Sequence, residues 1–231
     1  MLTPSLGRLK RMNKVYKETK KVLLGKQDVK PRYKSLIEYI SKEFNIKVIN
    51  IFVDTLKIRK QLENRIWIIV KTNEECEPFI NHEYKNNVLD PFGTEYNKKL
   101  YNEIMLNHKE IIKYPEQKTF IVYKAFENDA IHEYYGKLPN NFFKKLKRNF
   151  CEEIWEIRNL WSMNYVMVYT NNQIDKCKEK YESTLQNLIF QEIKKYDFCN
   201  LINSKEDIEI TFDSKENFDN KYEGSWFYYT R

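Results

Sequence analysis

The chain has 231 residues and a mass of 28.3 kDa, and its residues are 42% hydrophobic, 32% charged and 15% aromatic. This composition is too apolar and too aromatic for a disordered chain, and the length suffices to bury a core without disulfides or metal ions. The formal net charge of +7 arises in residues 1–34, which hold eleven basic and two acidic residues, whereas residues 35–231 are nearly neutral.

The N-terminal segment has the pattern of an amphipathic helix. Apolar residues recur at steps of three and four from Leu9 to Leu23. This period predicts a helix over residues 9–24, and Gly25 is a suitable C-terminal stop. Two interpretations are open for residues 1–34. They form either a surface helix that lies on its own domain, or a basic arm that docks its apolar stripe on a partner and presents its cations to a polyanion.

Lysine dominates the rest of this arm. Lysine favours contact that is independent of sequence, because bidentate recognition of bases relies mostly on arginine. The residues predicted to bind a partner or nucleic acid are Arg8, Lys10, Arg11, Lys14, Lys17, Lys20, Lys21 and Lys26.

The body of the chain alternates helical and strand patterns. In the first half, we expect a helix over 31–44, strands over 46–54 and 66–70, an irregular segment over 73–93, a helix over 95–113, and a strand over 120–123 in a hairpin with 130–135. In the second half, we expect a helix over 140–160, a strand over 165–169, a helix over 175–196, and strands over 208–213 and 226–230.

These elements predict an α+β fold with a mixed or mainly antiparallel sheet covered by helices. We expect residues 35–231 to form one compact domain, with residues 1–34 as a basic helical arm. The alternative is a division into halves at 35–138 and 139–231. A weak repeat supports such halves, because residues 49–55 resemble residues 208–214. A tryptophan follows at the same spacing in each copy, which predicts two helix–strand–strand units. The aspartate in each copy is then expected to form a turn rather than to act in catalysis.

Common catalytic motifs are missing from the sequence. With glycine only at positions 7, 25, 93, 136 and 224, a phosphate-binding loop, a dinucleotide fingerprint and a nucleophile elbow cannot form. The three histidines are His82, His108 and His132, and their spacing is not that of metal ligands. We therefore expect no metal and no cofactor.

A metal-dependent nuclease is the enzymatic alternative. Asp54, Glu63 and Arg65 loosely match the Asp…Glu-x-Lys pattern of restriction-type nucleases, with arginine in place of lysine. Glu116 and Lys118 supply a literal Glu-x-Lys, for which Asp90 is a distant acidic candidate. Both patterns arise easily by chance in a chain with this many charges.

The compartment follows from the cysteines and from the length of the apolar runs. No run reaches the roughly 18–20 residues that span a bilayer. Cys151 and Cys177 fall on apolar stripes, and none of the four cysteines forms a CxxC pair with another. The sequence therefore predicts a cytoplasmic protein, or a virion protein assembled in the cytoplasm, with no membrane association.

The exclusions and the segregated charge favour a non-enzymatic structural or assembly protein. Its basic N-terminal helix is expected to dock on a protein partner or on a second copy of the chain, close to nucleic acid. The alternatives are a sequence-independent nucleic-acid-binding protein, the metal-dependent nuclease, and an immunity-type inhibitor. The aromatic run at 226–231 is a candidate for stacking on bases or for a protein interface.

Overall fold

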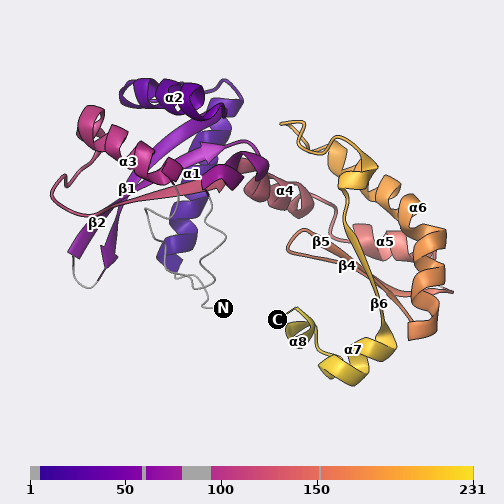
Figure 1. Ribbon diagram of the computed structural model, residues 1–231. Coiled ribbons are helices and arrows are strands. Elements are labelled where there is room, and N and C mark those ends of the chain that lie inside the picture. Colours follow the sequence, from indigo (N-terminus) through magenta and orange to yellow (C-terminus); the bar gives the residue numbers. More distant parts are fainter. Residues whose placement is uncertain (1–5, 59–60, 80–94, 151, 231) are drawn as a thin grey trace. The chain divides into compact units, whose positions relative to one another are not determined.

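The computed structural model describes residues 6–58, 61–79, 95–150 and 152–230, and the side chains of residues 6–12 and 58 are outside this description. The chain divides into two compact units, Met1–Asp129 (unit 1) and Ala130–Arg231 (unit 2), and the basic helix belongs to unit 1. Each unit holds one small mixed sheet with helices around it, so the α+β fold class is confirmed (Figure 1).

Unit 1 is built around three strands. Its elements are α1 (Leu6–Leu23), α2 (Pro31–Phe44), β1 (Val48–Ile58), β2 (Gln61–Val70), the 3₁₀ helix η1 (Glu74–Phe79), α3 (Glu95–Asn107), η2 (Lys109–Ile111) and β3 (Thr119–Ala125). The helix α4 (Phe126–Gly136) follows and continues into unit 2. The strand order is β1-β2-β3, with β1 antiparallel and β3 parallel to β2.

The central strand β2 explains why unit 1 needs helices on both faces. Its residues are buried continuously from Glu63 to Val70, as expected for a strand covered on two sides. On one face, Ile66 and Ile68 join a core with residues of α2 and α3, including Leu36. The other face receives α1.

Unit 2 repeats this arrangement. Its elements after α4 are α5 (Phe142–Arg148), β4 (Ile154–Leu160), β5 (Met163–Val168), η3 (Asn171–Gln173), α6 (Ile174–Lys194), η4 (Lys205–Asp207), β6 (Ile210–Ser214), α7 (Lys215–Tyr222) and α8 (Trp226–Tyr229). The strand order is β4-β5-β6, again with an antiparallel hairpin followed by a parallel third strand.

Matching hydrogen bonds extend the likeness between the units. In unit 1, the N–H of Glu127 donates to the carbonyl of Lys71 at 3.1 Å. The carboxylate of Glu127 in turn accepts the N–H of Asn73 at 2.7 Å. These bonds join the first turn of α4 to the segment that follows β2.

Unit 2 makes the same two bonds one unit later. The N–H of Glu216 donates to the carbonyl of Tyr169 at 3.3 Å, and the Glu216 carboxylate accepts the N–H of Asn171 at 3.0 Å. They join the first turn of α7 to the segment after β5. The sequence Val-x-Thr-Asn stands at both places, at 70–73 and 168–171. The equivalent strands are therefore β2 and β5.

The repeat predicted from the sequence is not confirmed in the form expected. It paired residues 49–55 with 208–214, but the first segment lies in the hairpin strand β1 and the second ends in the third strand β6. Trp226 opens the helix α8, so the strand expected over 226–230 is wrong. Trp226 and Tyr229 both pack on Tyr165 of β5, and one helical turn brings residues three apart to the same side.

The helix expected over 140–160 is also wrong, because α5 ends at Arg148 and β4 takes its second half. Ile154 and Ile157 are three residues apart and both buried, which imitates a helical stripe. A β-bulge between Ile154 and Glu156 produces this spacing, since one extra residue lets both isoleucines face the core.

The hairpin expected between 120–123 and 130–135 does not form. The strand β3 pairs with β2 in parallel, and residues 126–136 are the helix α4. Parallel pairing requires a crossover, which α3 and the segments around it supply.

Candidate functional site

The helix α1 buries its apolar stripe within its own unit. Val15 is 1% exposed and Thr19 is fully buried, and the Thr19 hydroxyl accepts a hydrogen bond from Asn50 of β1 at 3.3 Å. The Tyr16 ring stacks on Phe126 of α4 at 5.1 Å between centroids. The predicted helix is present, and the buried side of its described part, residues 13–23, lies on its own sheet. The side chains of Leu9 and Met12, which begin the predicted stripe, are outside the description.

The opposite face of α1 is the lysine face. At about 100° per residue, Lys17 lies roughly opposite the midpoint of Val15 and Thr19, and Lys14 and Lys21 lie within about 60° of it. All three lysines are exposed. Burying the stripe therefore leaves the cations directed at solvent.

The candidate residues differ in what they contact. Lys14 reaches Glu18 at 3.9 Å, and Lys20 is half-buried over the Tyr16 ring. Among the described residues, no acidic partner lies within ion-pair distance of Lys17, Lys21 or Lys26. The remaining candidates are Arg8, Lys10 and Arg11, whose backbone is helical and whose side chains lie outside the description.

A shallow hollow of about 400 Å³ lies beside the lysine face, lined by Lys14, Phe52, Asp54 and Lys113 among others. The ammonium groups of Lys14 and Lys30 lie 5.6 and 5.8 Å from the Phe52 ring centroid. Cations thus border an aromatic ring at this end of the sheet.

Asp54 has a structural partner, and the turn expected at this residue is wrong. Asp54 lies within β1, opposite Arg65 of β2. Both carboxylate oxygens accept hydrogen bonds from Arg65, at 2.9 and 2.6 Å, and Oδ1 also accepts one from Trp67 at 3.3 Å. The Arg65 guanidinium stacks on Trp67 at 4.3 Å. This cluster is a largely buried ion pair, with the side chains of Arg65 and Asp54 8% and 14% exposed, and its arginine occupies the position where the nuclease pattern has a lysine.

The other nuclease residues do not converge on it. Glu63 is buried on β2, and Glu116 and Lys118 are exposed in the turn before β3. Asp90 lies outside the described residues. In the part of the chain that the structure describes, no three His, Cys, Asp or Glu side chains are placed to hold a metal ion.

Two of the histidines are described. His108 is buried, and its Nε2 lies 3.4 Å from the Glu103 carboxylate. His132 is exposed on α4. His82 is outside the description, as is Cys151. Of the cysteines, burial raises the pKa of Cys76 to about 11, so its thiol is not activated.

Several aromatic side chains of unit 2 are exposed. Trp226 and Tyr229 pack on Tyr165, whereas Phe227 and Tyr228 are about half exposed on α8. These two belong to the aromatic run predicted for stacking, which therefore presents only part of its rings.

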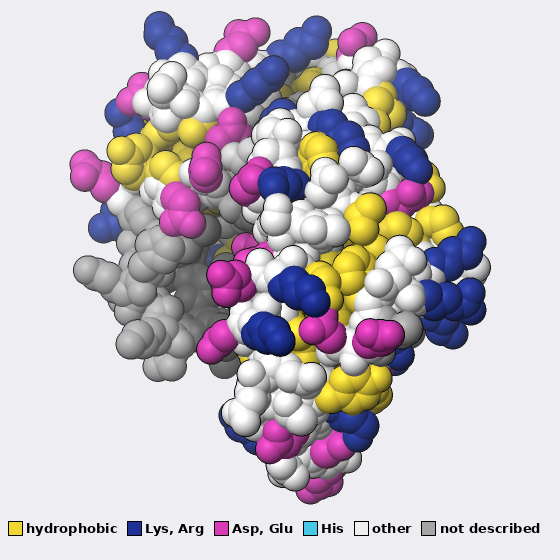
Figure 2. Space-filling model, turned by 90° about the vertical axis from the view of Figure 1, so that its right-hand side faces the viewer, with side chains coloured by type: hydrophobic (Ala, Val, Ile, Leu, Met, Phe, Trp, Pro, Cys, Tyr) yellow, Lys and Arg dark blue, Asp and Glu magenta, His cyan; other side chains and the backbone are white. Residues whose placement is uncertain are grey.

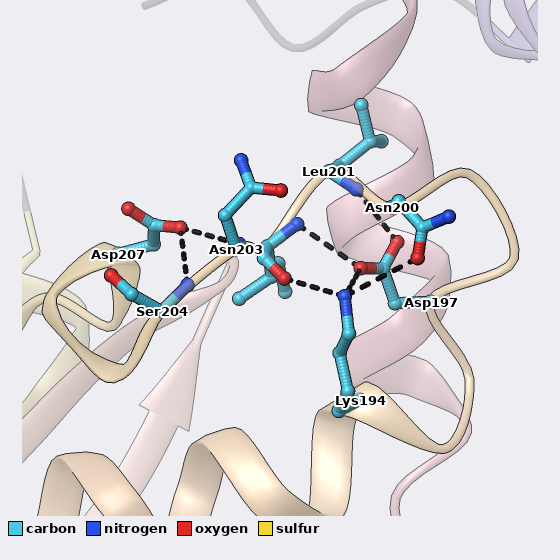
Figure 3. Close-up of polar contacts among 8 residues, drawn as sticks. Lys194, Asp197, Asn200, Leu201, Asn203, Ser204 and Asp207 are labelled. Carbon is cyan, nitrogen blue, oxygen red and sulfur yellow. Dashed lines mark hydrogen bonds and ion pairs between the residues drawn. The ribbon is translucent and has the colours of Figure 1, made fainter.

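The segment between α6 and β6 is held by a buried carboxylate (Figure 3). Asp197 accepts the N–H groups of Leu201 and Ile202 at 2.9 and 3.1 Å, and Lys194 at 2.9 Å. Burial alone raises the pKa of Asp197, but these donors outweigh it and lower the pKa. The charge is therefore structural. In unit 1 the uncharged Asn64 of β2 holds the segment before β3, because its side chain donates to the Tyr114 carbonyl at 2.7 Å.

A second basic group was missed in the sequence. Residues 134–151 contain five basic and no acidic residues, and four of these cations lie on α5. The signal was visible as a charge run, but a helix predicted to continue to residue 160 spread these lysines over a longer element with acidic residues. On the face drawn in Figure 2, both charges are interspersed over most of the surface, and Lys and Arg side chains gather at its right-hand edge.

Comparison with known proteins gives no relative of this chain: no family model, no curated protein and no solved structure matches it. Within the described ranges, no helix is both long and apolar enough to cross a membrane.

Proposed function

We propose that this chain is a non-enzymatic interaction protein that binds nucleic acid without reading its sequence, through the lysine face of α1. The observation that carries the proposal is that the two sides of α1 have different surroundings. Its apolar side is buried on β1, and its lysine side is exposed with Lys17 and Lys21 unpaired among the described residues. Phosphates are the expected ligands because they accept contacts from lysine without fixed geometry.

The test measures the affinity of the full chain for a fluorescent DNA duplex, read from fluorescence anisotropy, at a series of salt concentrations. Lys17→Glu/Lys21→Glu is expected to weaken binding at least about tenfold at low salt, and to make the slope of log affinity against log salt shallower by about 2. Removing two phosphate contacts suppresses the release of about two counterions.

The matched control is Lys42→Glu/Lys98→Glu, which makes the same charge change at two exposed lysines of α2 and α3. It is expected to leave most of the affinity intact. The proposal fails if both double variants lose the same affinity, or if the unaltered chain does not bind the duplex at low salt.

A role in assembly, with a protein partner or a second copy of this chain, stays a prediction. So do the cytoplasmic or virion location and the immunity-type alternative. The ion pair at Asp54 and Arg65 speaks against the nuclease alternative, because the arginine neutralises the carboxylate that a metal ion needs.

A further inference from the structure

The four cations of α5 lie on one side of this helix. At about 100° per residue, Lys144, Lys145, Lys147 and Arg148 span an arc of roughly 160°. Leu146 is 6% exposed and lies opposite the middle of this arc. Leu146 is the one fully packed residue of α5, and the four basic side chains lie on the other side of the helix, with Lys144, Lys145 and Arg148 exposed and Lys147 half-buried.

These cations are also unpaired, unlike most others in unit 2. No described acidic side chain is within ion-pair distance of any of the four. Elsewhere in unit 2, eight basic side chains form ion pairs: Lys137, Arg158, Lys178, Lys180, Lys194, Lys195, Lys205 and Lys215. Since unit 2 supplies acidic partners for cations in general, their absence around α5 is a local property.

The helix at the equivalent place in unit 1 shows the contrast. Both α2 and α5 directly precede the hairpin of their unit. On α2, acidic residues stand among the basic ones, and Glu43 pairs with Lys99 of α3. The neighbours of α5 are instead neutral, with Asn140, Asn141 and Asn149 exposed at its two ends. The shared architecture therefore does not require an all-cationic helix.

We infer that α5 is a second binding surface, which takes the phosphate backbone of nucleic acid. Four unpaired cations on about two helical turns are complementary to a chain of closely spaced negative charges. The exposed side chains of α5 are all basic, and its two phenylalanines, Phe142 and Phe143, are half-buried, which favours a polyanion over a protein partner that needs a hydrophobic anchor. This inference goes beyond the proposed function, since it concerns other residues in the other unit.

The experiment uses the full chain and the same fluorescent duplex. Lys145→Glu/Arg148→Glu is expected to weaken binding at least about tenfold at low salt, with a salt slope shallower by about 2. The neutral variant Lys145→Gln/Arg148→Gln changes the charge by half as much as the glutamate variant. It is therefore expected to lose about half as much log affinity. Circular dichroism and the thermal midpoint confirm folding, because Leu146 is retained in both.

The control is Lys195→Glu/Lys221→Glu, an equal charge change at two exposed lysines of unit 2. The inference is overturned if the α5 variants bind like this control, even when the α1 variant has lost affinity. If the α5 variants lose affinity and the α1 variant does not, the inference stands and the proposed site on α1 fails. Equal binding by every variant rejects both surfaces.

Discussion

The two units share a strand order and the bonds around their middle strands, yet the residues that pair across their hairpins differ, and one of these pairs is charged in unit 1. Counted back from the ends of β2 and β5, Asp54 and Arg65 of unit 1 correspond to Leu160 and Met163 of unit 2. An ion pair with little exposure thus stands where the other unit has an apolar pair, of which Met163 is 45% exposed. In unit 1 the hairpin continues past this pair, and in unit 2 the chain turns there. The same backbone pairing accepts either chemistry, provided that both partners change together.

The units also differ in where their cations lie. Unit 1 presents them on α1, a helix that covers one face of its sheet, and unit 2 presents them on α5, beside the start of its hairpin. Since the core contacts of each helix use other positions, charge is free to vary between equivalent architectures. The basic surfaces are therefore a property of each unit's solvent face.

The largest expected effect breaks the ion pair of unit 1. Asp54→Ala leaves the Arg65 guanidinium, whose side chain is 8% exposed, without its anion. We expect a loss of about 3 kcal/mol in the free energy of unfolding of unit 1. Urea unfolding of the full chain, with amide hydrogen exchange resolved over β1 and β2, measures this loss.

Copying the apolar pair of unit 2 sharpens the same comparison. Asp54→Leu/Arg65→Met is expected to restore stability to within about 1 kcal/mol of the unaltered chain, because no buried charge remains. A double variant as unstable as Asp54→Ala would contradict the equivalence of the two pairs.

A smaller effect on stability concerns the polar side chains that hold the segment before the third strand, Asp197 in unit 2 and Asn64 in unit 1. Because its folded pKa is lowered, the Asp197 carboxylate contributes stability that is present above the ordinary aspartate pKa of about 4. This contribution is lost as the pH falls through the lower folded value. Asp197→Asn is expected to lower the stability of unit 2 by about 2 kcal/mol at pH 7, since Lys194 and two N–H groups lose their anionic acceptor.

Hydrogen exchange over α6 and β6 between pH 6 and pH 3 measures this dependence. The unaltered chain should lose protection on acidification more steeply than Asp197→Asn. Asn64 carries no charge, so the segment that it holds before β3 serves as the internal reference. Parallel pH profiles for the two chains would rule out the charge of Asp197 as the cause.

The smallest expected effect concerns the bonds that the units share. Glu127→Ala and Glu216→Ala each remove an acceptor for one backbone N–H and an anion from the first turn of a helix. We expect about 1 kcal/mol from each, confined to the bonded segments at α4 and α7. Site-resolved hydrogen exchange checks this, and a loss more than twice as large in one unit than in the other would show that the bonds are not equivalent.

Elements with a clear local period were predictable. The helices α1, α2 and α6 and the strand β5 are close to the expected ranges, because each carries a continuous apolar stripe or run. The strand expected over 66–70 is only the second half of β2, whose first half is largely polar. The end of α5 was not predictable in this way. A bulge at Ile154 reproduces a helical spacing within a strand, and only pairing with β5 distinguishes the two.

The candidate site was predictable only in part. The excess of lysine in residues 1–34 is a property of the sequence, and so is the run of cations at 144–148. Whether a lysine is free depends on the acidic groups that folding brings beside it, such as Glu153 for Lys180. The sequence alone also left open the role of Asp54, because its partner Arg65 meets it across a hairpin.

The sequence by itself determined the amphipathic helices, the buried middle strands and the excess of positive charge, since these depend on neighbours within a few residues. The tertiary structure decided which surface the stripe of α1 covers, that the third strand of each unit runs parallel to the second, and which cations remain unpaired. These outcomes depend on contacts between residues far apart in the chain, which no local period encodes.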